Sequence, residues 1–226
     1  MTFVGSDGAR VAWTLVVPLK PLSRAKSRLA DAAADHVRPG LALAFAQDTV
    51  GAALACRAVR GVTVVTDDPL AARELSALGA RVLPDPPGGG LNAALAQGAL
   101  AVRRQSPAAA VAALNADLPA LRPAELEQVL EAASAFPRAF LADAAGVGTT
   151  LLAAAPGVEL SPAFGGASRA RHRASGAREI GLRGVDSVRR DVDTAEDLRA
   201  ALALGVGPHT AQHARFFRAR FSSGAP

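Results

Sequence analysis

The chain has 226 residues, about half of them apolar, and a formal net charge of +5 at pH 7. This length and apolar content fit one domain with a sizeable core, and they exclude a chain that is disordered throughout. The small positive excess suits an anionic metabolite. The chain has no tyrosine and one tryptophan, which argues against a base-stacking surface and hence against nucleic acid as a partner.

A single cysteine, Cys56, cannot form an internal disulfide or a thiol metal cluster, so a reducing compartment fits best. No apolar run approaches the length that spans a bilayer, and residues 1–10 lack the charged-then-apolar order of a signal peptide. We therefore expect a cytoplasmic protein with no membrane partner.

Short apolar segments typical of strands alternate with Ala- and Leu-rich segments typical of helices. In chain order, we expect strands over residues 13–17, 61–66, 81–83, 109–114, 139–142, 149–154 and 185–192. Helices are expected over residues 41–54, from Pro69 after Asp67 and Asp68, and over residues 91–103, 123–133, 169–175 and 195–204. This alternation predicts βαβ units, and therefore an α/β domain with a Rossmann-like mixed, mostly parallel sheet flanked by helices.

The second half of the expected sheet is less regular, because residues 139–142 and 149–154 are separated only by a glycine-containing turn and should form a hairpin. We find no repeat and no linker, so one domain is expected over residues 1–207. The last segment, residues 208–226, contains three arginines and no acidic residue. We expect it to be a basic, mobile tail.

A basic loop follows the first expected strand and contains Lys20, Arg24, Lys26 and Arg28. Ligands of open α/β sheets bind beyond the carboxyl ends of the strands, so the position suits phosphate groups. The chain has 23 arginines and only two lysines, and both lysines lie in this loop. A lysine ammonium is a compact, mobile point charge that can follow a phosphate through a reaction. The alternative interpretation is a solvated basic turn.

Carboxylates are placed where a metal could bind. Asp117 directly follows an apolar strand, and Asp191 and Asp193 are two apart on an expected extended segment, so they should face the same side. Mg²⁺ prefers oxygen ligands and usually takes one or two carboxylates together with substrate phosphates. Asp117 with one of the later pair would satisfy that requirement. Alternatively, Asp193 or Thr194 caps the last helix.

Two glycine-rich segments, residues 146–150 and 164–168, add potential for binding anions, because glycine lets an anion approach the backbone. Ser168 is placed to cap the helix that follows, and the amides at a helix start favour an anion. The alternative is a turn and cap without a ligand. Among the arginines after this cap, His172 is expected to be an exposed helix residue.

Together these segments resemble the motifs of the phosphoenolpyruvate/2-phospholactate guanylyltransferases, which act in the biosynthesis of coenzyme F-420. The matching segments are residues 17–29, 65–68, 90–94, 115–119, 148–152, 164–165 with Ser168, 171–172, 175–177 and 191–194. The resemblance spans about residues 11–205 and implies a nucleotidyltransferase fold of the GT-A-like type, similar to that of the enzyme that guanylylates molybdopterin.

The resemblance also implies roles for individual residues. The acceptor, phosphoenolpyruvate, would be held by Thr150, Gly165 and Ser168. Mg²⁺ would be held by Asp117 and by Asp191 or Asp193. The triphosphate of GTP would be held by Lys20, Lys26 and Arg28, and the base would lie near Gly90 and Asn92. Lys26 and Asp117 would be the catalytic residues.

The implied reaction transfers GMP from GTP to an acid phosphate and releases pyrophosphate. The arginine- and alanine-rich composition is typical of GC-rich bacterial genomes, whose members of this family mostly use phosphoenolpyruvate, so we expect that acceptor and the product enolpyruvyl-2-diphospho-5′-guanosine. The alternatives are 2-phospho-L-lactate as the acceptor, a sugar-type nucleotidyltransferase or glycosyltransferase on the same fold, and a non-catalytic GTP-binding module. A homodimer is open as an alternative to a monomer.

Overall fold

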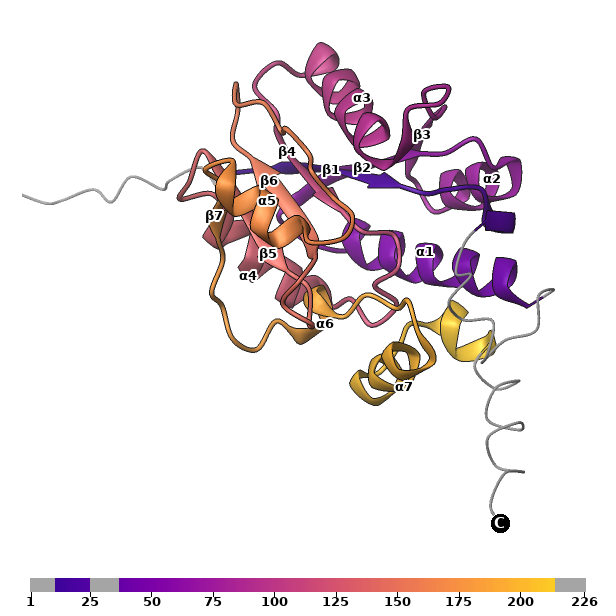
Figure 1. Ribbon diagram of the computed structural model, residues 1–226. Coiled ribbons are helices and arrows are strands. Elements are labelled where there is room, and N and C mark those ends of the chain that lie inside the picture. The colour runs from indigo at the N-terminus through magenta and orange to yellow at the C-terminus, as the bar shows by residue number, and fades with distance from the viewer. Residues whose placement is uncertain (1–10, 25–36, 214–226) are drawn as a thin grey trace, which may run out of the picture.

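A seven-stranded sheet forms the centre of the computed structural model, which describes residues 11–24 and 37–213 (Figure 1). The strands are β1 (Trp13–Pro18), β2 (Val59–Val65), β3 (Arg81–Leu83), β4 (Ala110–Leu114), β5 (Arg138–Ala142), β6 (Thr149–Ala154) and β7 (Arg178–Glu179). Their order across the sheet is β3-β2-β1-β4-β6-β5-β7. Only β6 runs antiparallel to its neighbours, β4 and β5, and the other paired strands are parallel. The expected mixed, mostly parallel sheet and its β5–β6 hairpin are therefore confirmed.

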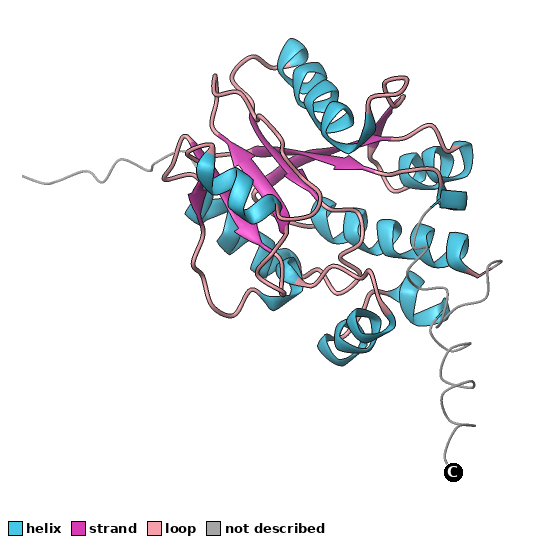
Figure 2. Cartoon of the chain, in the orientation of Figure 1, coloured by secondary structure: helices cyan, strands magenta, loops and turns pink. Residues whose placement is uncertain are grey.

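Helices cover both faces of this sheet (Figure 2). They are α1 (Arg38–Leu54), α2 (Pro69–Ala77), α3 (Gly90–Gln105), α4 (Pro123–Ala133), α5 (Ser168–Ala174), α6 (Asp186–Arg189) and α7 (Ala195–Leu204), with a 3₁₀ turn, η1 (Leu22–Arg24), after β1. Side chains of α1, α2 and α4 belong to the core on one face, and side chains of α3 belong to the core on the other. The expected bounds of α4 and α7 are confirmed to the residue.

Alternating side chains of the central strands supply the two cores. In β1, Leu15 and Val17 pack on the side of α1, whereas Val16 packs on the side of α3. The α3 helix lies very close to the sheet at Gly98, where an added Cβ would stand 2.4 Å from Val16 Cγ1 and 3.0 Å from Val65 Cγ2. A glycine is therefore required for this approach of helix to sheet.

Side-chain hydrogen bonds cap the starts of two helices, α2 and α7. Asp68 Oδ1 accepts the N–H groups of the second and third residues of α2, which confirms the helix start expected at residues 67–69. At α7 the capping residue is Thr194, which forms a reciprocal capping box with Asp197. Asp193 is therefore not the cap of α7, and one of the two alternatives for this carboxylate is removed.

The expected strand over residues 185–192 is wrong. Residues 186–189 form the short helix α6, and the chain from Arg190 to Thr194 has no regular structure. The three valines of this segment, Val185, Val188 and Val192, are all fully buried. Their spacing of three and four residues is the helical period, whereas the sequence analysis predicted a strand over this segment.

Residues 208–213, the first part of the expected tail, are helical. Asp48 of α1 is buried and accepts the backbone N–H groups of His209 at 3.1 Å and Thr210 at 2.8 Å, so this short helix is fastened to α1. The rest of the expected tail lies outside the described residues. Among residues 11–24 and 37–213, no helix combines the length and the apolar character needed to cross a bilayer.

Candidate active site

The order of the strands changes direction between β1 and β4. From β1 the chain builds outward through β2 and β3, and it then returns to β4 on the other side of β1. In open α/β sheets, ligands bind beyond the carboxyl ends of the strands at such a point. A cavity of about 660 Å³ lies here, and its lining includes Lys20 after β1, Asp117 after β4 and Asp143 after β5. The sequence reasoning identified Lys20 and Asp117, but it missed Asp143 as a lining residue.

Asp117 lies on a loop that α1 holds in place. The hydroxyl oxygen of Thr49 in α1 accepts the N–H of Leu118 at 3.0 Å, and it lies 2.7 Å from the carbonyl of Phe45 and 3.2 Å from that of Ala116. One fully buried side chain therefore fixes the backbone on both sides of Asp117. Sequence reasoning missed Thr49, and no local pattern could have found its role, because the two partners that flank Asp117 are 67 and 69 residues away.

A second contact brings Asp191 and Asp193 to the same loop. The N–H of Val192 donates to the backbone carbonyl of Asp117 at 3.0 Å. Asn115 Nδ2 lies 3.5 Å from Asp191 Oδ2, and Asp117, Asp191 and Asp193 all line the cavity. The structure therefore brings together the three carboxylates that the sequence singled out.

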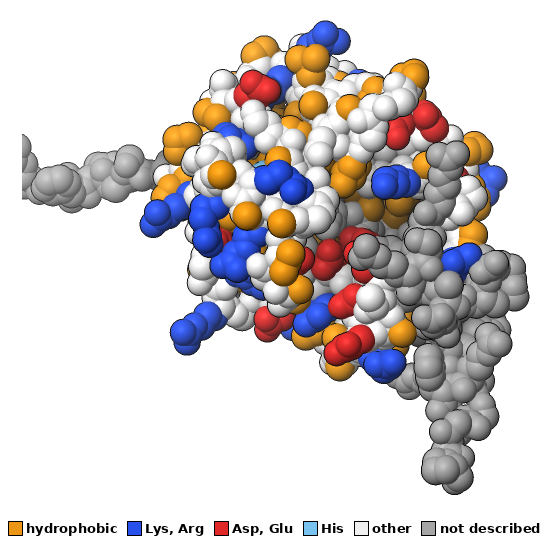
Figure 3. Space-filling view, viewed as in Figure 1, with side chains coloured by type: hydrophobic (Ala, Val, Ile, Leu, Met, Phe, Trp, Pro, Cys, Tyr) orange, Lys and Arg blue, Asp and Glu red, His pale blue; other side chains and the backbone are white. Residues whose placement is uncertain are grey.

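These carboxylates create a strongly negative region. Burial, and then the negative charges of Asp117, Asp193 and Asp143, raise the pKa of Asp191 to about 7 from its ordinary value of 3.8. Acidic side chains are seen near the centre of one face of the molecule, with Lys and Arg side chains around them (Figure 3). Such a group holds its negative charge only at a cost, and a bound cation would relieve that cost.

The donor chemistry fits a hard cation. In the part of the chain that the structure describes, no three His, Cys, Asp or Glu side chains are grouped so as to hold a metal ion by themselves. Mg²⁺, however, usually takes one or two protein carboxylates and completes its shell with water and phosphate oxygens. Asp117 with Asp191 or Asp193 supplies carboxylates of that kind in a cavity that has room for a phosphorylated ligand.

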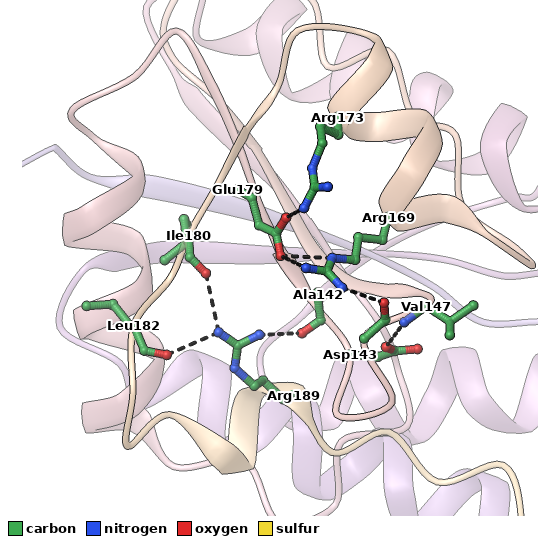
Figure 4. A network of polar contacts seen from close by, with 10 residues as sticks. Ala142, Asp143, Val147, Arg169, Arg173, Glu179, Ile180, Leu182 and Arg189 are labelled. Atoms are coloured by element: carbon green, nitrogen blue, oxygen red, sulfur yellow. Dashed lines mark hydrogen bonds and ion pairs between the residues drawn. The ribbon is translucent and has the colours of Figure 1, made fainter.

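The turn between β5 and β6 contributes Asp143, Val147 and Gly148 to the lining of the cavity. Figure 4 shows the polar contacts that hold this turn. The carboxylate of Asp143 accepts the N–H of Val147 at 2.9 Å and that of Gly148 at 2.8 Å. Arg169 donates to the carbonyl of Gly146 at 2.8 Å and forms an ion pair with Glu179. Both oxygens of Asp143 are thus used to hold the turn, which favours a structural role for this carboxylate.

Hydrogen-bond donors line another part of the cavity. Thr149, Gly165, Gly166 and Ser168 all contribute to its wall. Ser168 was expected to cap α5, but this is wrong: the capping position is Ala167, and Ser168 is the first helical residue, 1% exposed. In this position on α5, Ser168 is buried and lines the cavity.

His172 was expected to be exposed, and this also is wrong, because the side chain is fully buried. It lies one helical turn after Ser168, on the same inward face of α5. Burial, and then the positive charges of Arg138 and Arg171, lower the pKa of His172 to about 4. The ring is therefore neutral at physiological pH. The spacing of four residues from Ser168, which the sequence analysis assigned to the acceptor, was the signal that could have placed His172 on the same face of the helix.

The remaining candidate residues are placed as follows. Thr150 is fully buried, and its neighbour Thr149 is the one that lines the cavity. Asn92 uses its amide to bond the backbone of Phe164, donating at 3.2 Å and accepting at 2.7 Å, and it thereby joins the start of α3 to the 164–168 loop. Gly90 begins α3 with φ +68°, and the next residue, Leu91, lines the cavity. Lys26 and Arg28 lie outside the described residues.

Comparisons with known proteins agree with this arrangement. A family model described as "Guanylyl transferase CofC like" matches residues 13–223. A phosphoenolpyruvate guanylyltransferase of Streptomyces scabiei is 75% identical over 203 residues, covering 88% of this chain and 94% of that protein.

Two solved structures are similar in fold. A nucleotidyl transferase from Methanothermobacter has a TM-score of 0.60 at 21% identity, with 85% of this chain and 97% of that chain covered. Rv0371c of Mycobacterium tuberculosis, solved in complex with manganese, has a TM-score of 0.51 at 23% identity, with 85% and 98% covered. At these identities the likeness establishes the nucleotidyltransferase fold and no more.

Proposed function

Because the chain belongs to the CofC-like guanylyl transferase family, we propose that it transfers GMP from GTP to phosphoenolpyruvate in the biosynthesis of coenzyme F-420. The products are enolpyruvyl-2-diphospho-5′-guanosine and pyrophosphate. The observation that carries this proposal is the 75% identity to a phosphoenolpyruvate guanylyltransferase over nearly the whole length of both chains. The cavity at the switch in strand order supports it, because it combines carboxylates, a lysine and hydrogen-bond donors.

The chemistry depends on charge neutralisation and positioning. An oxygen of the acceptor phosphate attacks the α-phosphorus of GTP, and a new P–O bond forms as the bond from the α-phosphorus to the bridging oxygen breaks. Pyrophosphate leaves with the electron pair of the broken bond. The acceptor phosphate is already ionised at neutral pH, so no strong general base is needed. In agreement, the described lining of the cavity contains no histidine.

We assign the metal site to Asp117 together with Asp191 or Asp193, with Mg²⁺ as the ion. Carboxylate oxygens are the donors that Mg²⁺ prefers, and the crowding that raises the pKa of Asp191 favours a cation. When bound, the ion would neutralise negative charge on the nucleotide phosphates. The backbone that carries these carboxylates is held by the hydroxyl of Thr49 and by the hydrogen bond from the N–H of Val192 to the carbonyl of Asp117.

The roles of the other residues follow from the family motif. Lys20 lines the cavity and is assigned to the triphosphate, together with Lys26 and Arg28. Lys26 and Asp117 are the proposed catalytic residues. The acceptor is assigned to Thr150, Gly165 and Ser168, and the last two line the cavity. Gly90 and Asn92 are assigned to the neighbourhood of the base; the amide bonds of Asn92 to Phe164 favour an indirect role for it.

The proposal extends to the location of the enzyme in the cell, the extent of its catalytic domain and its oligomeric state. The enzyme acts in the cytoplasm, as the single cysteine indicates. Residues 1–207 form the catalytic domain and residues 208–226 a basic extension, of which the first residues are fastened to Asp48. A homodimer is an alternative to a monomer, and the molecular mass in solution decides between them.

Pyrophosphate release tests the proposed reaction. GTP, ATP, CTP and UTP are each offered with phosphoenolpyruvate or 2-phospho-L-lactate, with Mg²⁺, with Mn²⁺ and with a chelator. We expect release with GTP and phosphoenolpyruvate and none with the chelator. A higher kcat/KM for 2-phospho-L-lactate than for phosphoenolpyruvate would identify 2-phospho-L-lactate as the acceptor, and the assignment as a guanylyltransferase would stand. No release with GTP and either acceptor would overturn the proposal.

A further inference from the structure

His172 is held by two hydrogen bonds in an apolar position behind the cavity wall. Its Nε2 lies 3.0 Å from the backbone nitrogen of Ala163, and its Nδ1 lies 2.9 Å from the hydroxyl oxygen of Thr149. The rings of Phe140 and Phe164 flank it, with centroids 5.7 and 5.1 Å from the imidazole. Although fully buried, the side chain thus has a partner on each ring nitrogen.

These partners determine where the proton of the ring lies. A backbone N–H can only donate, so Nε2 must offer its lone pair to Ala163 and cannot carry a hydrogen. The neutral ring then carries its hydrogen on Nδ1 and donates it to the oxygen of Thr149. The lowered pKa of His172 is consistent with this neutral tautomer. The two hydrogen bonds therefore run in one direction: the N–H of Ala163 donates to His172, and His172 donates to Thr149.

The hydroxyl of Thr149 is thereby left with its own hydrogen to donate. Thr149 lines the cavity with Gly165, Gly166 and Ser168. The N–H groups of Gly165 and Gly166 make no hydrogen bond within the described residues, whereas the carbonyls of these glycines are engaged by Arg171 and by the N–H of Ser168. This part of the wall therefore presents donors, which is the chemistry that recognises a carboxylate or a phosphate.

We propose that His172 orients the hydroxyl of Thr149 as a hydrogen-bond donor to an anionic oxygen of the acceptor. Thr149 contacts the acceptor directly, and His172 is a positioning residue that acts through it. The inference rests on the proposed function, because it assigns this wall of the cavity to phosphoenolpyruvate. The family motif assigned Thr150, Gly165 and Ser168 to the acceptor. The inference adds Thr149, which lies next to Thr150, and His172, which is buried behind the cavity wall.

Steady-state kinetics with separate KM values for the two substrates test the inference. Thr149→Val keeps the shape of the side chain and removes the hydroxyl. A hydrogen bond to a charged group contributes about 1.5–3 kcal/mol, which is about 10- to 150-fold in affinity. We expect KM for phosphoenolpyruvate to rise by about that factor, KM for GTP to stay within about twofold, and Thr149→Ser to recover most of the loss. The matched control is Thr210→Val, another fully buried threonine, which lies outside the cavity and should change neither KM.

A double-mutant cycle tests the part played by His172. His172→Leu removes both ring nitrogens and should raise KM for phosphoenolpyruvate in the wild-type background. In the Thr149→Val background it should add no further rise, because its effect passes through the hydroxyl. If His172→Leu does not fold, His172→Asn, which keeps a donor near the Nδ1 position, should retain a KM for phosphoenolpyruvate below that of Thr149→Val.

The outcomes separate this inference from the proposed function. If the unmodified enzyme releases no pyrophosphate from GTP and phosphoenolpyruvate, the proposed function fails. If the enzyme is active but Thr149→Val leaves KM for phosphoenolpyruvate unchanged, or raises both KM values equally, only the assignment of Thr149 fails. Additive effects of His172 and Thr149 would show that the imidazole does not act through the hydroxyl.

Discussion

Asp191→Asn should stabilise the metal-free protein at alkaline pH. In the unfolded chain the carboxyl titrates near 3.8, whereas in the folded chain burial and three neighbouring carboxylates raise its pKa to about 7. The folded state therefore binds more protons between these values, and the free energy of unfolding falls as the pH rises through about 7. This difference in pKa corresponds to at most about 4 kcal/mol in the free energy of unfolding at pH 8.

Urea unfolding measures this effect. With a chelator present, the variant should exceed the parent protein in free energy of unfolding at pH 8 and should lose that advantage near pH 4.5. His172, with its lowered pKa, titrates in the same acidic range, but it is present in both proteins and cancels in the difference. Glu159→Gln, which removes an exposed carboxylate from a loop, is the matched control and should show no such pH dependence. Mg²⁺ should stabilise the parent more than the variant. An advantage of equal size at both pH values, or a less stable variant at pH 8, would refute the reasoning.

Three further predictions concern the site and its support. Asp117→Asn should abolish pyrophosphate release while circular dichroism and Tm show an intact fold, because an amide cannot replace a carboxylate on Mg²⁺; unchanged activity and an unchanged Mg²⁺ requirement would contradict this. Thr49→Val leaves the N–H of Leu118 without its acceptor, so we expect a loss of about 1–3 kcal/mol in urea unfolding and a lower kcat, with recovery in Thr49→Ser; full activity in the valine variant would show that the Asp117 loop does not depend on this hydroxyl. Gly98→Ala should lower stability by about 1–3 kcal/mol because its Cβ would overlap Val16, and a stabilised variant would mean that α3 moves away from the sheet without loss.

The local signals in the sequence were sufficient for most of the fold. Apolar periodicity and helix-start residues located the strands and helices, and α4 and α7 have the expected bounds. The expectation failed over residues 185–192, where three buried valines at helical spacing were interpreted as a strand. A short apolar segment does not by itself distinguish the two periods, and packing against neighbouring elements decides between them.

The candidate site was partly accessible in the same way. Lys20, Asp117, Asp191 and Asp193 could be named from their positions after strands or within a family motif, and all four line one cavity. The raised pKa of Asp191 could not be predicted, because it depends on how deeply the fold buries this carboxyl and on which carboxylates it brings near. The order of residues in the sequence does not say how far apart residues 117 and 191 lie in the folded protein.

Only the tertiary structure decided the parts of the site that depend on long-range contacts. Thr49 fixes the loop of Asp117 from α1, Asn92 fixes Phe164 from α3, and His172 contacts Thr149 from α5. Each is a polar side chain whose neighbours in the sequence give no sign of its partner. The sequence by itself determined the types and periods of the residues, and hence the elements and the chemistry available. Which hydroxyl, amide and imidazole hold that chemistry in place was decided by how the elements pack, because a buried polar group takes the partner that the fold puts within reach.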